Sequence, residues 1–185
     1  MSDNHSYKGK IIIANPFLQG PIFERSVVFM VEHNHEGGMG FILNQPTGVV
    51  VGQAVEQIKN CDFPVYHGGP VDDNILFYIH SLGEKVPKSV QVSEGLYWGG
   101  DFEEICNLIE NGQVSSNEIK FFVGYSGWSE LQLEGEFEQD SWIVCDYKAS
   151  YLFDDQNKSL WNKCLESKKT KISLYSKFAH TPSLN

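Results

Sequence analysis

The spacing of apolar residues changes several times along the chain, which predicts a mixture of strands and helices. Runs of branched and aromatic residues predict strands over 10–14, 26–32, 40–44, 65–67, 75–79, 118–124 and 142–145, and a strand pair over 91–98 that Gly95 interrupts. Helical spacing predicts helices over 51–60, 102–111, 129–137 and 157–166. Strands and helices do not alternate strictly, so the pattern favours an α+β fold over a parallel α/β sheet.

Two of the predicted helices carry capping residues. Asp101 is the expected N-cap of the second helix, with Glu104 as its capping-box partner and Gly112 as the stop. Ser129 is the expected N-cap of the third helix, with Gln132 at its third position. Both helices should therefore begin at these polar residues.

Glycine-rich segments predict the reversals between strands. The paired glycines within residues 33–39 predict a hairpin turn, and Gly68-Gly69-Pro70 predicts a tight loop between two strands. Ser126-Gly127 predicts a third turn, after the strand that ends at Gly124.

Length and composition are those of an ordinary globular domain. The chain has 185 residues, of which 41% are hydrophobic, and we expect one domain over 1–166. Residues 167–185 form a lysine-rich tail that is either an edge strand or disordered. No apolar stretch reaches the roughly 18 residues of a membrane span, and the polar start lacks a signal sequence, which predicts a cytoplasmic protein.

Four cysteines are scattered along the chain, at positions 61, 106, 145 and 164. No Cys-x-x-Cys pair occurs, so we expect reduced thiols in the core rather than a zinc or redox site.

Charge is distributed unevenly. The formal net charge is −10, and residues 101–146 hold eleven acidic residues and one lysine. Residues 156–185 instead hold six lysines and one acid. Nucleic-acid affinity comes largely from basic groups that displace counterions, so a nucleic-acid partner is disfavoured.

Three acidic residues of the predicted third helix recur at every fourth position: Glu130, Glu134 and Glu138. Like charges at this spacing destabilise an isolated helix. Either the packing of Leu133 and Phe137 compensates, or a basic partner does, such as the lysine-rich tail of another copy in a homo-oligomer.

Four motifs, in order, resemble the YqgE/AlgH family of bacterial proteins. They are Ile11-Ile-Ile-Ala-Asn-Pro16, Gly40-Phe-Ile-Leu-Asn-Gln-Pro-Thr47, His67-Gly-Gly-Pro-Val71 and Gly124-Tyr-Ser-Gly-Trp-Ser-Glu-Leu-Gln-Leu-Glu134. The resemblance implies a bifurcated, mostly antiparallel sheet that curls into a pseudo-barrel with helices packed outside. It implies no established activity: members are described as uncharacterised, or as transcriptional regulators after a link to alginate control in one lineage.

The chain departs from the family pattern at two positions. Gln45 stands where the family has arginine before proline, and glutamine cannot supply that residue's cationic fork. Leu131 stands where the family usually has glycine, which predicts an ordinary packed helix position there.

The segment Gly124-Tyr-Ser-Gly-Trp128 has the strand–turn–helix context of a nucleophile elbow. Trp128, however, occupies the last glycine of the Gly-x-Ser-x-Gly pattern, and only His180 follows the serine as a possible base. A structural turn is therefore the favoured interpretation, and we predict no catalytic residue.

Signatures of metals and cofactors are incomplete. His33 and His35 could share an ion only with a third ligand such as His67, and solvated turn residues are the favoured alternative. Around Gly37-Gly-Met-Gly40, Leu43 replaces the third glycine of a dinucleotide fingerprint. We predict no metal and no cofactor.

One candidate ligand site remains, at predicted strand ends where glycine lets backbone segments approach closely. It comprises Asn44, His67, Gly68, Gly69, Gly124, Tyr125, Ser126 and Trp128. The alternative is that these glycines only serve tight corners of a curled sheet.

The sequence therefore favours a non-enzymatic protein in a regulatory role, with a protein or small-molecule partner. An enzyme that uses His67, Tyr125 or Ser126 is the first alternative. The second is the DNA-binding regulator that the family description suggests, which the net charge of −10 disfavours.

Overall fold

The computed structural model describes residues 6–18, 20–145, 151–153 and 157–167. The tail predicted over 167–185 lies outside these residues except for its first residue, which ends the last helix.

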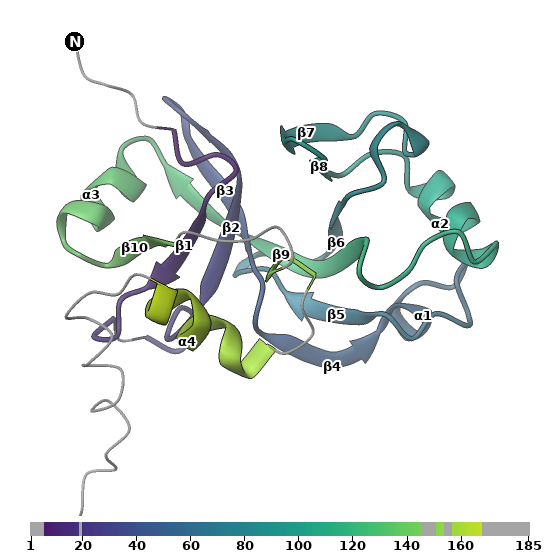
Figure 1. Ribbon diagram of the computed structural model, residues 1–185, viewed down its shortest axis with the longest axis horizontal. Coiled ribbons are helices and arrows are strands. Elements are labelled where there is room, and N and C mark those ends of the chain that lie inside the picture. Colours follow the sequence, from purple (N-terminus) through teal and green to yellow (C-terminus); the bar gives the residue numbers. More distant parts are fainter. Residues whose placement is uncertain (1–5, 19, 146–150, 154–156, 168–185) are drawn as a thin grey trace, which may run out of the picture.

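Within the described residues, ten strands form one sheet, and four α-helices and a short 3-10 helix lie around it (Figure 1). The strands are β1 Ile11–Ala14, β2 Val27–Asn34, β3 Gly37–Ile42, β4 Pro46–Val50, β5 Pro64–His67, β6 Val71–His80, β7 Val90–Ser93, β8 Leu96–Trp98, β9 Ile119–Ser129 and β10 Trp142–Cys145. The helices are α1 Val51–Ala54, η1 Gly83–Lys85, α2 Phe102–Glu110, α3 Gln132–Glu138 and α4 Asn157–Ser167.

Strand β9 connects the two halves of the molecule (Figure 1). Its first half pairs with β5, through Phe121 to Val123, and its second half pairs with β3, through Ser126 to Ser129. Strand β6 pairs with the opposite edge of β9. The sheet therefore forks along β9, into a branch that runs β3-β2-β1-β10 and a branch that carries β5 and β4.

The predicted α+β class and the predicted bifurcated sheet are confirmed. All strand pairs are antiparallel except β5 with β9. The sheet curls but does not close, because its main path begins at β10 and ends at β7 without a pairing between them.

Strand β1 is fully buried because the fold covers both of its faces. Ile11 and Ile13 pack in a core that also contains Leu160 and Trp161 of α4. Ile12 packs on the other face, in a cluster with the tryptophans of β9 and β10. This two-sided burial explains why the strand reads as a continuous apolar run rather than an alternating one.

Helix α2 begins and ends where the sequence predicts. The Asp101 side chain accepts a hydrogen bond from the Glu104 backbone N–H, and Gly112 lies just beyond the last turn with φ +66°. The capping box is only half formed, however, because the Asp101 N–H donates to Pro87 O instead of to the Glu104 carboxylate. Three apolar side chains of α2 are buried in the core: Ile105, Cys106 and Leu108.

The first predicted helix, over 51–60, is wrong for most of its length. α1 is a four-residue helix capped by Val55, whose backbone is extended (φ −125°, ψ 111°). Val51 and Gly52 donate their N–H groups to Phe63 O and Cys61 O, so the segment folds onto the chain that follows it. Val55 and Ile58 are nevertheless buried in the core. Their helical spacing thus reflects the side chains that the core covers, not a continuous helix.

The predicted turn at Ser126-Gly127 is also wrong. Strand β9 runs straight through this dipeptide, and Ser126 and Gly127 pair with Gly40 and Met39 of β3. Small residues occur here because two strands lie against each other, not because the chain reverses. The hairpin predicted within 33–39 does form, but its strands extend to Asn34 and Gly37.

Helix α3 begins at Gln132, three residues later than predicted. Ser129 is not its N-cap, since that position is Leu131; the Ser129 N–H and hydroxyl both donate to the Gln132 side-chain oxygen. Glu130 therefore precedes the helix, and the predicted three-residue acidic stripe does not form. Leu133 is buried, and Glu134 Oε1 lies 3.3 Å from His33 Nε2, so core packing and this polar contact both support helix α3.

The prediction that Leu131 occupies an ordinary packed helix position is wrong. Its φ is +58°, in the left-handed region, and its side chain is 70% exposed. A glycine would adopt this conformation without a steric penalty, whereas a Cβ costs about 1–2 kcal/mol.

We predict that Leu131→Gly is more stable to urea than Leu131→Ala by about 1 kcal/mol. Both variants remove the same exposed side chain, but only alanine keeps the Cβ that the left-handed backbone disfavours. Urea titrations monitored by circular dichroism measure the difference. Equal stability, or a more stable alanine variant, would show that the backbone here is not strained.

Candidate functional site

Most of the predicted ligand site meets where β9 changes partner. The Gly68 N–H donates to Val123 O (2.9 Å), and Gly68 O accepts from the Ile42 N–H (2.9 Å) and from Ser126 Oγ (3.0 Å). A Cβ at Gly68 would overlap Gly124 O, and one at Gly69 would overlap the Tyr125 backbone. The structure thus brings these residues together, and backbone atoms fill the space between them.

The remaining predicted residues lie around this junction rather than in one cavity. The Asn44 side chain accepts from the Val27 N–H and donates to Arg25 O, both at 2.9 Å, and so fixes the chain before β2. Trp128 is buried and donates its indole N–H to Glu136 Oε2 (2.9 Å). The His67 side chain is exposed at the end of β5.

Tyr125 and Trp128 also line a groove of about 500 Å³ along β3 and β9. Its other lining groups include Glu32, Glu36 and Met39, and Trp128 contributes from a buried position. This groove contains no part of Gly68, Gly69 or His67, so the eight predicted residues do not share one site.

Ser126 does not have the environment of a nucleophile. Its side chain is fully buried, and its hydroxyl donates to Gly68 O. Among the described residues no imidazole is hydrogen-bonded to it, although nucleophilic catalysis needs a base within hydrogen-bonding distance.

A serine–imidazole contact that the sequence did not indicate lies in the other half of the molecule. His80 Nε2 is 3.0 Å from Ser89 Oγ and 3.1 Å from Gly99 O. His80 Nδ1 accepts the Leu82 N–H at 3.3 Å, so the ring proton resides on Nε2 and points to Gly99 O. Nε2 therefore has no lone pair to accept the serine proton, and Ser89 Oγ donates to Val86 O (2.7 Å).

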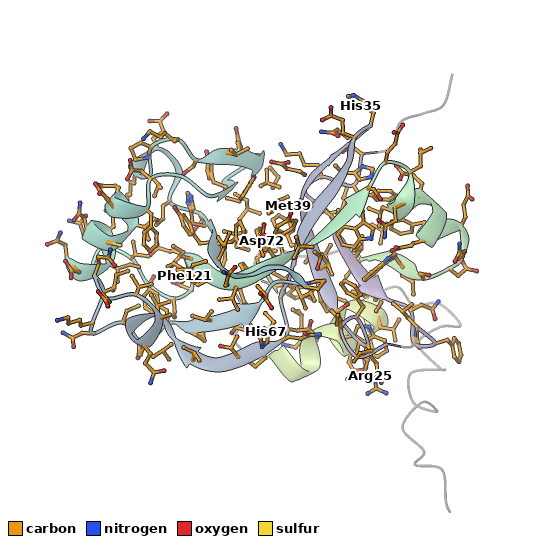
Figure 2. The ribbon with its side chains drawn as sticks, turned by 180° about the vertical axis from the view of Figure 1, so that it is seen from behind. Arg25, His35, Met39, His67, Asp72 and Phe121 are labelled. Atoms are coloured by element: carbon orange, nitrogen blue, oxygen red, sulfur yellow. The ribbon has the colours of Figure 1, made fainter. Side chains whose placement is uncertain are left out.

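The histidines that the sequence offered as metal ligands lie apart. Figure 2 shows His35 at the tip of the β2–β3 hairpin and His67 on the opposite side of the molecule. His33 Nδ1 accepts from the Tyr7 N–H (3.3 Å), and its Nε2 faces Glu134. In the described part of the chain, no group of three or more histidine, cysteine or acidic residues has the arrangement of a metal site.

The four cysteines are buried and form no disulfide, as predicted. Burial raises the pKa of the Cys61 and Cys106 thiols. A hydrogen bond with Cys145, together with burial, raises the pKa of Cys164. Thiols with raised pKa values are poor nucleophiles at neutral pH.

An apolar concavity, which we call the aromatic cleft, lies between α1, β6, β8 and α2. Its volume is about 660 Å³, and it is lined by residues 54–57, 74, 76–78, 98–99, 102 and 123. The regular pairing of β6 with β9 is interrupted between Val71 and Leu76, and this irregular segment places Asn74 at the cleft. Gly99 and Gly100, with φ of +64° and +111°, turn the chain from β8 into α2.

Four aromatic residues line this cleft: Phe77, Tyr78, Trp98 and Phe102. The Tyr78 and Phe102 ring centroids lie 5.9 Å apart, and the Tyr78 hydroxyl donates to Gly100 O (2.8 Å). Burial, and secondarily the charge of Asp101, raises the pKa of Tyr78 to about 12. The Tyr78 side chain is therefore neutral and held in place, and it does not act as an acid or base at physiological pH.

Local sequence patterns did not indicate the aromatic cleft, because its lining residues are spread along the chain from Ala54 to Val123. The family model described as "DUF179: AlgH-like" matches residues 11–173. The chain belongs to the AlgH-like family.

Among the helices of the described residues, none is long and apolar enough to cross a bilayer.

Relatives of this AlgH-like chain cover nearly its whole length. A UPF0301 protein of Chlorobium luteolum is 40% identical, over 96% of this chain and 94% of its own, and one of Bacteroides thetaiotaomicron is 37% identical, over 96% and 91%. The solution structure of AlgH from Pseudomonas aeruginosa superposes with a TM-score of 0.74 at 25% identity, over 100% of this chain and 99% of that one. A crystal structure from Corynebacterium diphtheriae has the same fold, with a TM-score of 0.74 at 21% identity over 95% and 94%.

Gln45, one of the two departures from the family pattern, has a local structural role. Its side-chain amide donates to Ile22 O at 2.8 Å and so holds the segment before β2 against the start of β4. In this AlgH-like chain the side chain at that position is engaged with the protein itself.

We predict that Gly68→Ala destabilises the protein by about 2–3 kcal/mol, because its Cβ has no room beside the Gly124 carbonyl. Gly135→Ala is the matched control. Gly135 lies inside α3 with open space around it, so alanine should stabilise the protein there by about 0.5–1 kcal/mol. Thermal unfolding measures the stability of each variant. A Gly68→Ala protein as stable as wild type would contradict the close approach of Gly68 to the Gly124 carbonyl.

We also predict that His80 makes the protein less stable as the pH falls. Burial lowers the pKa of His80 in the folded state, so the unfolded state, with a pKa of about 6.5, binds the proton more tightly. Stability is therefore lost as the pH falls through about 6.5.

Urea unfolding at pH 8, 7, 6 and 5 measures this dependence. The His80→Gln variant, which retains a donor near the position of Nε2, should lose less stability between pH 7 and 5 than wild type does. An unchanged dependence in that variant would exclude His80 as the cause.

Proposed function

We propose that this AlgH-like protein is a non-catalytic binding protein that takes a small, largely apolar ligand in the aromatic cleft and acts in a regulatory role. The observation that carries the proposal is the cleft itself, whose volume of about 660 Å³ is typical of small-molecule sites. Its walls are mostly aromatic and aliphatic, with a few polar groups at Glu56, Gln57 and Asn74.

The cleft has a rigid frame, as preformed ligand sites do. Tyr78 is held by its bond to Gly100 O, and the Gly99 N–H donates to Tyr78 O at 3.0 Å. His80 Nε2 donates to Gly99 O, and Ser89 Oγ lies 3.0 Å from the same His80 nitrogen. These contacts fix the β8–α2 turn, so a ligand would meet walls that are already ordered.

Binding without catalysis is favoured by the state of the two serines that resemble nucleophiles. Ser126 donates to Gly68 O and Ser89 donates to Val86 O, and neither faces an imidazole lone pair among the described residues. The acidic net charge of −10 likewise favours a small ligand over DNA as the direct partner.

We predict that a neutral, environment-sensitive naphthalene dye binds the wild-type protein and that Ala54→Trp weakens this binding at least about tenfold by filling the cleft. Ile75→Trp is the control: Ile75 is 47% exposed and is the neighbour of two lining residues, but does not itself line the cleft. Fluorescence titration measures both affinities. Equal binding to both variants, or none to wild type, would contradict the proposal.

A further inference from the structure

Acidic residues occur in the lining of the aromatic cleft and next in sequence to residues that line it. Glu56 lines the cleft, and none of the described residues that line it is basic. On β6, Asp73 precedes the lining residue Asn74, and on α2, Glu103 follows the lining residue Phe102. All three acidic side chains belong to exposed residues.

Neither of two nearby lysines lines the cleft. Lys88 Nζ is 3.4 Å from Asp101 Oδ2, so it offsets the charge of that residue at the start of α2. Lys59 lines a neighbouring groove, whose lining also includes Glu110 and Glu56, so Glu56 borders both concavities. Among the described residues that line the cleft itself, the charged one is Glu56, which gives the cleft a negative local potential.

The interior of the cleft suits the body of an organic cation. The rings of Tyr78, Trp98 and Phe102 carry negative electrostatic potential on their faces, which attracts a cation within about 6 Å. Because the Tyr78 hydroxyl already donates to Gly100 O, that residue offers its ring rather than its hydroxyl. An aromatic or branched apolar body would bury against Leu76 and Val123.

We infer that the ligand of the aromatic cleft is an organic cation: an apolar, preferably aromatic, body that carries an amine or ammonium group directed toward Glu56. This inference rests on the proposed function and adds the charge of the ligand to it. A ligand carboxylate or phosphate would instead lose its hydration beside Glu56 with no base in the cleft to replace it.

Because Glu56 is exposed, its contribution is screened by water and salt. The charge should therefore change affinity only several-fold, and the effect should shrink at high ionic strength. The aromatic walls supply the part of the affinity that salt does not remove.

Three compounds with one naphthalene skeleton test the inference: naphthylmethylamine, naphthylmethanol and naphthoate. In calorimetric titrations of the full chain at low salt, we expect the ammonium compound to bind about five- to tenfold tighter than the alcohol. The carboxylate should bind weakest. At 0.5 M salt the advantage of the ammonium compound should fall to about twofold.

Glu56→Gln should weaken the ammonium compound about three- to fivefold and leave the alcohol unchanged. Glu138→Gln is the matched control, since it removes one exposed carboxylate from α3, at the opposite end of the molecule (Figure 1), and should change neither affinity.

Equal affinities for the three compounds, or a preference for the carboxylate, would overturn the inference about charge while the binding function stands. If Glu138→Gln reduces the affinity of the ammonium compound relative to the alcohol as much as Glu56→Gln does, the role of Glu56 is overturned. No binding of any compound, together with no dye binding to wild type, would overturn both proposals.

Discussion

The close backbone crossing between Gly68-Gly69 and Gly124 is the constraint on which the rest of this AlgH-like structure depends. Here the end of β5 leaves the edge of β9 and the end of β3 takes its place, while Gly68 bonds to Val123, Ile42 and Ser126. Side chains at Gly68 or Gly69 would force the segments apart. The fork in the sheet, and with it the division into two halves, follows from this contact.

Each half then builds its own core and its own surface. One half buries β1 on both faces and joins the indole N–H groups of Trp128 and Trp142 to the carboxylate of Glu136. In the other half, the buried His80 bonds to Gly99 O in the β8–α2 turn, and Gly99 also lines the aromatic cleft. Gly68, Gly69 and Gly124, which the sequence placed in a candidate ligand site, therefore shape the fold and do not line this cleft.

Local sequence signals correctly predicted the elements that are marked by capping residues or by runs of branched and aromatic residues. α2 begins at its aspartate cap and ends at its glycine, and β10 and the β7–β8 pair occur where branched and aromatic residues predicted them. The signals failed where long-range pairing decided the backbone. Ser126-Gly127 reads as a turn but is extended because β3 lies beside it, and 51–60 reads as a helix but folds back onto the segment at Phe63.

The residue pattern alone was enough to predict the α+β class, the family and the burial of the cysteines, because composition, apolar period and ordered motifs can be read along the chain. The fold was needed to show that Leu131 is left-handed, that no base of the described residues is hydrogen-bonded to Ser126, and that Tyr78, Trp98 and Phe102 share a cleft with Glu56. These features join segments that are far apart along the chain. Their geometry is set by how strands pair and where the sheet forks, which no local pattern of residues encodes.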